Sequence, residues 1–340
     1  MTNDGNYNCT IASSVYTGEA IVHIGKEGLD FQTGKGAFPL DYANVHGFRL
    51  KAWHFFLDTS TGTVELSHMG YDTEGFYEEL WLAYNRRSRE SLFIEGEPFM
   101  NAEGEYSYTD DGGRAKGTAK LCLYPTCACI MPTDCGARRI PLCFVQDLML
   151  DGYTIRILLD TEESYELIRL GRDTKPFFDN LGKFRKDAQV QWQEAHAALE
   201  SNLDNRLGEA LGRYNFLQDI CGKDLVISGL FSPEGSEFWI AAFGNGLAAV
   251  ELITEEKSAT YLYRLTDDKK VFEKRLRHAM EAMGVHREII FMEEDALKKN
   301  MLYSMGVERN AHLRFLRSCM FGRVIHTESW EKRIRESLNK

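Results

Sequence analysis

The stretch Val64-Glu-Leu-Ser-His-Met-Gly-Tyr-Asp-Thr-Glu-Gly-Phe76 occurs twice in this chain in related form. The second copy is Tyr165-Glu-Leu-Ile-Arg-Leu-Gly-Arg-Asp-Thr-Lys-Pro-Phe177, and the two share Glu-Leu, Gly, Asp-Thr and Phe at matching positions. They lie 101 residues apart. Similarity that recurs at a fixed spacing indicates a duplicated structural unit.

Shorter matches extend the repeat toward the N-terminus at offsets of 100 to 102 residues. They pair Leu57–Thr59 with Leu159–Thr161, Phe38–Tyr42 with Ile140–Phe144, and Leu29–Phe31 with Cys129–Met131. Further along, Arg264, Phe272 and Leu276 keep the spacing of Arg169, Phe177 and Leu181. We therefore expect two related modules and a diverged third one in the C-terminal part of the chain.

Each copy predicts short strands first and a helix last. In the first copy, runs rich in β-branched and aromatic residues alternate with turn residues; we expect strands over residues 20–24, 29–31, 37–42, 48–50, 53–57 and 63–67. Asp72 or Thr73 is a typical N-cap for the helix that follows. Phe76, Leu80 and Ala83 share one face of that helix, as Phe177, Leu181 and Phe184 do in the second copy.

Six or seven antiparallel strands capped by a C-terminal helix, in about 100 residues, resemble the pleckstrin-homology-like (PH-like) module. The segments Leu123–Cys127, Gly136–Phe144 and Ala311–Cys319 are similar to uncharacterised bacterial proteins that carry such modules in tandem. The resemblance implies an α+β fold with a bent antiparallel sheet or barrel in each module, and it implies no activity. The expected domains are residues 1–110, 111–216 and 217–340, the last with a helical tail.

The helix of the second copy is predicted to continue far beyond its module. Apolar residues from Phe177 to Leu203 keep a helical spacing, which predicts a connecting helix over residues 174–203. A second helix over residues 206–217 is expected to follow. Two shorter helices with a turn near Asn202 are the alternative.

An aromatic stripe on the first predicted helix is a candidate interface. Tyr77, Trp81 and Tyr84 lie beside the face formed by Phe76, Leu80 and Ala83, and the second copy has less apolar residues at these positions. A helix that already buries one face rarely exposes such side chains without a partner. The stripe is expected to pack on a neighbouring module or on a second subunit in a homodimer; a place in the core of its own module is the alternative.

Four cysteines are candidate metal ligands: Cys127, Cys129, Cys135 and Cys143. Zinc ligands usually come as C-x(2–4)-C pairs, whereas Cys127 and Cys129 have a single residue between them in an apolar run. On a strand these two thiols face the same way and fill a core as small apolar groups. The pattern favours buried thiols, and we expect no metal and no cofactor.

Composition restricts the classes of partner. The chain has 40 basic and 51 acidic residues, a net charge of −11 and a pI near 5.4, which disfavours a nucleic-acid partner. No 18-residue apolar run predicts integral membrane association, and the N-terminus has no secretory signal. We expect a cytoplasmic protein.

The segment from Arg309 onward reverses the overall charge and holds a candidate anion or partner patch, Arg314, Arg317 and Arg323. Pairing of these residues with acidic parts of the same chain is the alternative. Gly244-Asn-Gly246-Leu-Ala-Ala249 has the form of a dinucleotide fingerprint, but a strand follows it. Asn245-Gly246 is therefore expected to form a hairpin turn.

Three functions stay open from the sequence. The first is a non-enzymatic binding or scaffold protein that recognises an unidentified protein partner, for example by strand addition to a sheet edge. The second is binding to anionic lipid at a membrane surface, for which the early loops offer only Lys26, Lys35, Arg138 and Arg139. The third is an enzyme whose site would unite His312, Cys319 and His326.

Overall fold

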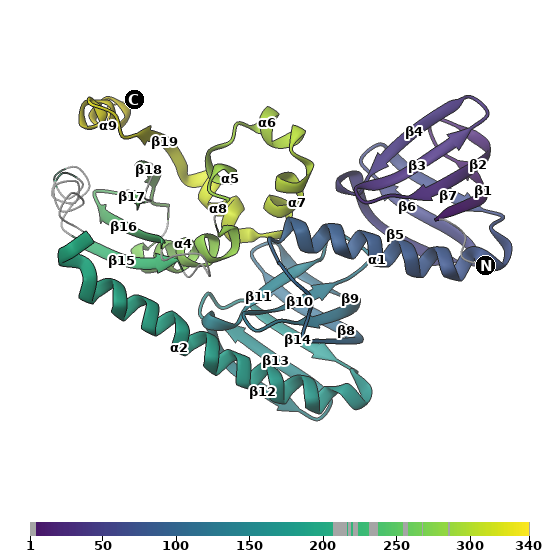
Figure 1. Cartoon of the computed structure of the whole chain (residues 1–340), viewed down its shortest axis with the longest axis horizontal. Helices are drawn as coiled ribbons and strands as arrows, with labels where there is room; N and C mark the ends of the chain where they lie inside the picture. The colour runs from purple at the N-terminus through teal and green to yellow at the C-terminus, as the bar shows by residue number, and fades with distance from the viewer. Residues whose placement is uncertain are drawn as a thin grey trace.

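A computed structural model describes residues 5–206, 216, 219, 224–230, 237–253, 258–266, 268–284 and 286–339. Its first unit is a seven-stranded antiparallel sheet of order β4-β3-β2-β1-β7-β6-β5. The strands are β1 Asn6–Ala12, β2 Thr17–Ile24, β3 Gly28–Thr33, β4 Gly36–Asp41, β5 Val45–Lys51, β6 His54–Thr59 and β7 Gly62–Ser67. Short 3₁₀ turns η1 Tyr42–Asn44 and η2 Gly70–Asp72 precede β5 and the helix α1, Thr73–Ser91. Figure 1 shows α1 running beneath this sheet and on to the second unit.

The second unit repeats this arrangement strand for strand, with the order β11-β10-β9-β8-β14-β13-β12. Its elements are β8 Met100–Asp110, β9 Gly113–Leu123, β10 Cys127–Met131, β11 Arg138–Pro141, η3 Leu142–Phe144, β12 Val145–Asp151, β13 Thr154–Leu159, β14 Ser164–Ile168, η4 Gly171–Asp173 and α2 Thr174–Arg206. The glycine shared by the two copies has the same function in both, because Gly70 and Gly171 have φ values of 61° and 59° at the turn into the helix. The duplication expected from the sequence is present as a duplicated topology.

The ladder registers correct part of the sequence alignment. Val45 pairs with Thr59 as Val145 pairs with Leu159, so the copies are offset by 100 residues here. Leu57 therefore corresponds to Ile157, and the match of Leu57–Thr59 with Leu159–Thr161 is displaced by two residues. A displacement of two keeps every side chain on the same sheet face, so the hydrophobic pattern did not reveal it.

A displacement by one residue has a larger effect. Leu29 pairs with Leu40, and Ala128 pairs with Ile140, so Leu29 corresponds to Ala128 and not to Cys129. Because alternate residues of a strand face opposite sides, Cys129 lies on the outer face of the second sheet. The aligned position in the first copy is Asp30, which is exposed.

The boundary between the two sheets lies earlier than residue 110. All of β8, Met100–Asp110, belongs to the second sheet and pairs with β9 and β14. A boundary at residue 110 would separate β8 from its own sheet. The strand β1 was not expected either, although alternate burial along Asn6–Ala12 marks it as half-buried.

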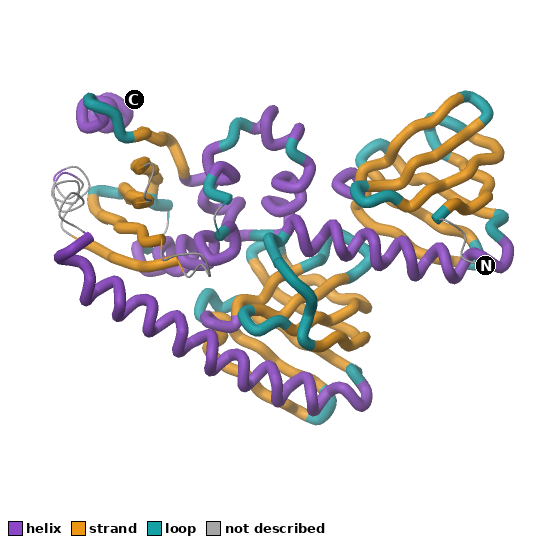
Figure 2. Tube along the Cα trace, in the orientation of Figure 1, coloured by secondary structure: helices purple, strands orange, loops and turns teal. Residues whose placement is uncertain are grey.

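The connecting helix is a single element. Figure 2 shows α2 as one continuous helix that leaves the second sheet and reaches the C-terminal unit. Phe177 and Leu181 are fully buried in the core of the second sheet. The second helix expected over residues 206–217 lies almost entirely outside the described residues.

The C-terminal unit holds a five-stranded sheet of order β15-β16-β17-β18-β19. Its strands are β15 Asp224–Leu230, β16 Glu237–Gly244, β17 Leu247–Ile253, β18 Ser258–Arg264 and β19 Met320–Ile325. The described helices are α4 Lys269–Met283, α5 Glu288–Phe291, α6 Glu294–Lys299, α7 Met301–Arg309, α8 Ala311–Cys319 and α9 Trp330–Leu338. Asn245 and Gly246, with φ values of 54° and 74°, form the turn of the β16–β17 hairpin, as the sequence predicted.

The C-terminal unit shares only part of the module plan. Phe272 and Leu276 on α4 are buried after β18, as Phe177 and Leu181 are after β14. Its described strands, however, form a simple series to which β19 is added after α4–α8, and they do not follow the seven-stranded order. None of the helices in the described part of the chain is long and apolar enough to cross a bilayer.

Candidate functional site

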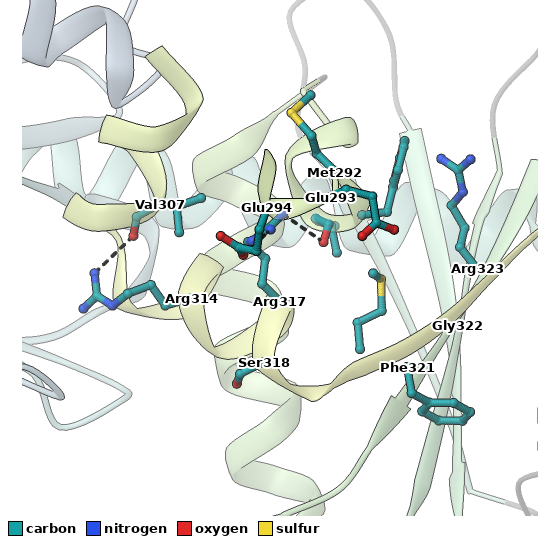
Figure 3. A pocket seen from close by; sticks show the side chains of 13 residues that line it. Met292, Glu293, Glu294, Val307, Arg314, Arg317, Ser318, Phe321, Gly322 and Arg323 are labelled. Carbon is teal, nitrogen blue, oxygen red and sulfur yellow. Dashed lines mark hydrogen bonds and ion pairs between the residues drawn. The ribbon is translucent and has the colours of Figure 1, made fainter. Parts of the chain in front are cut away.

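The three arginines of the candidate patch line one cavity of about 700 Å³. It lies between α5, the end of α7, α8 and β19, and Figure 3 shows the side chains that surround it. Its lining combines three kinds of group: the arginines Arg314, Arg317 and Arg323, the carboxylates Glu293 and Glu294, and the apolar side chains Ile290, Phe291, Met292, Val307, Met320 and Phe321. The patch is therefore a mixed polar and apolar hollow and not a simple basic surface.

Two of these arginines support the walls of the cavity. Arg317 donates to the backbone oxygen of Ile289 at 2.6 Å and to Glu294 Oε1 at 2.8 Å. The hydrogen bond from Arg317 lowers the pKa of Glu294. Arg314 donates to the backbone oxygens of Val307, at 3.1 Å, and Glu308 near the end of α7. Cations suit this position because the last carbonyls of a helix lack partners within it.

Arg323 on β19 differs from the other two. Its guanidinium lies 3.5 Å from the centre of the Phe291 ring, a stacked cation–π contact. Within the described chain, no carboxylate forms an ion pair with Arg323 or Arg314, whereas Arg317 has Glu294. The cavity therefore keeps cationic groups that an acidic ligand could pair with.

The cavity adjoins a sheet edge. Within the described chain, β19 pairs only with β18, so it forms the edge of the C-terminal sheet. Edge strands have unpaired N–H and C=O groups on their outer side, which favours the addition of another strand. The first four residues of β19, Met320–Arg323, also line the cavity. Main-chain and side-chain recognition groups therefore lie side by side.

The aromatic stripe lies at the junction of the modules. Trp81 is 8% exposed, and its Nε1 donates to the backbone oxygen of Met131 in the second module at 3.3 Å. Tyr84 is buried, donates to Val45 O at 3.2 Å within the first module, and accepts from Arg309 of α7 at 3.0 Å. Tyr77 packs on Phe48 and Phe55 of its own module. The stripe thus contacts its own sheet, the second sheet and α7.

The four candidate cysteines do not form one site. Cys127 and Cys129 are buried with their sulfur atoms 3.9 Å apart, in an apolar cluster that also contains Leu92, Cys122 and Met131. The hydrogen bond between the two thiols and the nearby Arg139 lower the pKa of Cys127, whereas burial raises that of Cys129. Cys143 lies with Cys127 on a second cavity, of about 440 Å³.

Cys135 lies apart from the other three cysteines, in the loop after β10. Its sulfur atom is 3.9 Å from Nδ1 of His46 in the first module. No spacing in the sequence links these two residues, because they are separated by 89 positions.

The residues of the enzyme hypothesis have separate surroundings. His312 Nε2 lies 3.2 Å from Glu163 Oε1 in the second module. His326 Nε2 lies 3.1 Å from Glu251 Oε2 and 2.9 Å from the hydroxyl of Thr260 on the C-terminal sheet. Cys319 is buried in the core between α4 and α8. The structure does not bring the three into a common cleft.

Sequence reasoning missed a set of ion pairs between the second module and the C-terminal unit. Arg139 forms a two-pronged pair with Glu281 of α4, at 2.6 Å for its Nη2, and both side chains are nearly buried. His278 Nε2 lies 2.6 Å from Asp160 Oδ1. Partners more than 100 positions apart leave no local pattern, so no sequence signal could have indicated them.

Neither a protein-family model nor a curated protein matches this chain.

Proposed function

We propose that this chain is a non-enzymatic binding protein that captures an extended segment of a protein partner at β19. The segment adds to the edge of the C-terminal sheet, places an apolar side chain in the cavity and pairs an acidic side chain with Arg323. A single observation carries the proposal: the sheet edge and the cavity share the residues Met320–Arg323. In strand addition, main-chain bonds supply affinity and side-chain pockets supply specificity.

Charge and shape favour an acidic peptide. Arg314 and Arg323 have no carboxylate partner within the described chain, whereas Glu294 is already paired with Arg317. Phe291, Met292 and Met320 offer apolar contacts beside these cations. The two modules then act as a scaffold. Their strand order with a closing helix supports the proposal that they are PH-like, and we propose a cytoplasmic location.

The same contacts weigh against anionic lipid. Arg139 is bound to Glu281, and Arg138 donates to Asp110 Oδ2 at 2.9 Å, so neither is available to a phosphate. Lys26 lies 3.9 Å from Glu90. The two arginines therefore serve the fold itself, which leaves only the exposed Lys26 and Lys35 for a lipid headgroup.

Selection from a displayed library of random peptides tests this function directly. We expect enriched peptides to combine an acidic with an apolar residue, and to increase the hydrogen-exchange protection of residues 320–325. Arg323→Glu should weaken their binding at least about tenfold, the loss of roughly one charge pair. Arg333→Glu makes the same charge change at an exposed residue of α9 and should leave binding unchanged.

Two results would contradict the proposal. One is a library that yields no binder to the folded chain. The other is a set of peptides that bind the Arg323→Glu and wild-type proteins equally well. The competing occupant of the edge is β19 of a second copy of the chain. Light scattering would then show a dimer in place of a monomer.

A further inference from the structure

Three side chains of metal-ligating type meet where the two modules and α7 come together. They are His46 at the start of β5, Cys135 in the loop between β10 and β11, and Glu308 at the end of α7. We propose that these three residues bind a Zn²⁺ ion that clips the first module, the second module and the C-terminal unit together.

The donor atoms already lie close to the geometry that zinc requires. A ligand nitrogen, sulfur and oxygen of the three residues all lie within 4.8 Å of one another, and Cys135 Sγ is 3.9 Å from His46 Nδ1. At bond lengths of about 2.0 to 2.3 Å, tetrahedral ligand atoms are roughly 3.5 Å apart. Small side-chain rotations would therefore complete the site.

The backbone holds two of the ligands in register. Cys135 N donates to His46 O at 3.2 Å, and Phe48 N donates to Thr133 O at 2.9 Å. Gly47 and Asp134 form a bridge between these two bonds. The loop after β10 thus pairs with β5 like a short extra strand, so its ligand is positioned before any ion arrives, as effective metal sites require.

The third ligand is held by a buried arginine. Arg309 lies 3.4 Å from Glu308 Oε2 through Nη1, and its Nη2 donates to the hydroxyl of Tyr84 at 3.0 Å. Its guanidinium orients the carboxylate from outside the set of ligands, as supporting residues of metal sites do. A thiolate and a carboxylate together balance the charge of Zn²⁺.

The donor types select the ion. Sulfur, imidazole nitrogen and carboxylate oxygen together suit Zn²⁺, whereas Ca²⁺ and Mg²⁺ prefer oxygen alone. His46 and Glu308 are exposed and Cys135 is half-buried, so water can supply a fourth ligand. Zinc binding would displace the proton of the Cys135 thiol, because the thiolate is the form that ligates the metal.

Calorimetric titration of ZnCl₂ into the chelator-treated full chain, with a zinc-free reductant, tests this site. We expect one ion per chain, and an increase in Tm as the ion binds. Cys135→Ser should weaken binding about a hundredfold or more, at or above the loss typical of supporting residues. Cys143→Ser removes a thiol from a different place and should bind as the wild type does.

Loss of binding in Cys135→Ser could also come from a folding defect. Glu308→Gln and His46→Gln test this, because both side chains are exposed, so each variant should fold and still bind zinc more weakly. Titration of Co²⁺ adds a spectroscopic readout, since the thiolate-to-cobalt absorption should vanish in Cys135→Ser. Wild-type protein that binds no stoichiometric zinc overturns the proposal. So does zinc binding that is unchanged in all three ligand variants, which would place the ion at the other cysteines.

Discussion

The pair of Arg139 and Glu281 makes the sharpest prediction about how the three units hold together. Arg139 comes from β11 and Glu281 from α4, and their side chains are 11% and 14% exposed. Burial by itself would lower the pKa of Arg139, but the Glu281 carboxylate outweighs it and raises that pKa. Glu281→Ala would leave a guanidinium buried beside Cys127 and Cys129 without its counter-charge.

The expected cost is large. Removal of one partner from a buried, hydrogen-bonded ion pair costs about 3 to 5 kcal/mol, because the remaining charge stays desolvated. With a urea m-value of about 3 kcal/mol/M for a chain of this size, the unfolding midpoint should fall by about 1 to 1.7 M. The double variant Arg139→Met with Glu281→Met removes both charges, so it should recover most of that loss.

Urea unfolding followed by circular dichroism measures both effects. Glu273→Ala is the matched control, because Glu273 lies on the same helix and forms an i,i+4 pair with Arg277. That local pair is worth only about 0.5 kcal/mol. The reasoning is refuted if Glu281→Ala shifts the midpoint no more than Glu273→Ala does, or if the double variant is as unstable as the single one.

Three further predictions concern other contacts. Burial lowers the pKa of His278 despite Asp160. Burial alone would raise the pKa of Glu163, but the nearby His312 imidazole lowers it. Both groups therefore bind fewer protons in the folded than in the unfolded state. Tm should fall as pH drops from 7 through their unfolded-state pKa values of about 6.5 for histidine and 4.3 for glutamate. His278→Gln should flatten the part of this profile near pH 6.5, and an unchanged profile would contradict the role given to His278. Trp81→Ala should cost about 3 to 5 kcal/mol of unfolding free energy by chemical denaturation, whereas Trp81→Phe should cost about 1 kcal/mol for the lost bond to Met131; equal costs would contradict this. Gly246→Ala should cost about 1 kcal/mol because its φ is 74°, while Asn245→Gly should leave Tm nearly unchanged, and the reverse order would be inconsistent with the hairpin turn.

Local pattern accounts for much of what the sequence predicted. Alternating burial, turn glycines and the 3.6-residue spacing of Phe76 and Leu80 are properties of neighbouring residues, so strands and helices followed from them. The register did not, because a shift of two residues leaves the pattern of faces unchanged. Cys129 is a different case, because a shift of one residue from the aligned register moves its side chain to the outer face of the sheet.

The candidate sites show the same division. The sequence grouped Arg314, Arg317 and Arg323 by charge, and the structure lines one cavity with them but gives each a different partner. It also grouped four cysteines by proximity along the chain, and the structure separates Cys135 from the rest. The charge of a residue and its spacing along the chain do not specify which group from another part of the chain will contact its side chain.

By itself, the sequence determined the duplicated unit, the order of strands before helix within it, and the long helix that leaves the second copy. Each of these rests on interactions between residues that are close in the chain or repeated at a constant spacing. Only the tertiary structure decided how α1 packs on the second module and α7 packs on α1, and which residues meet there. His46, Cys135 and Glu308 lie far apart in the chain, and long-range packing, which no local pattern encodes, brings them together.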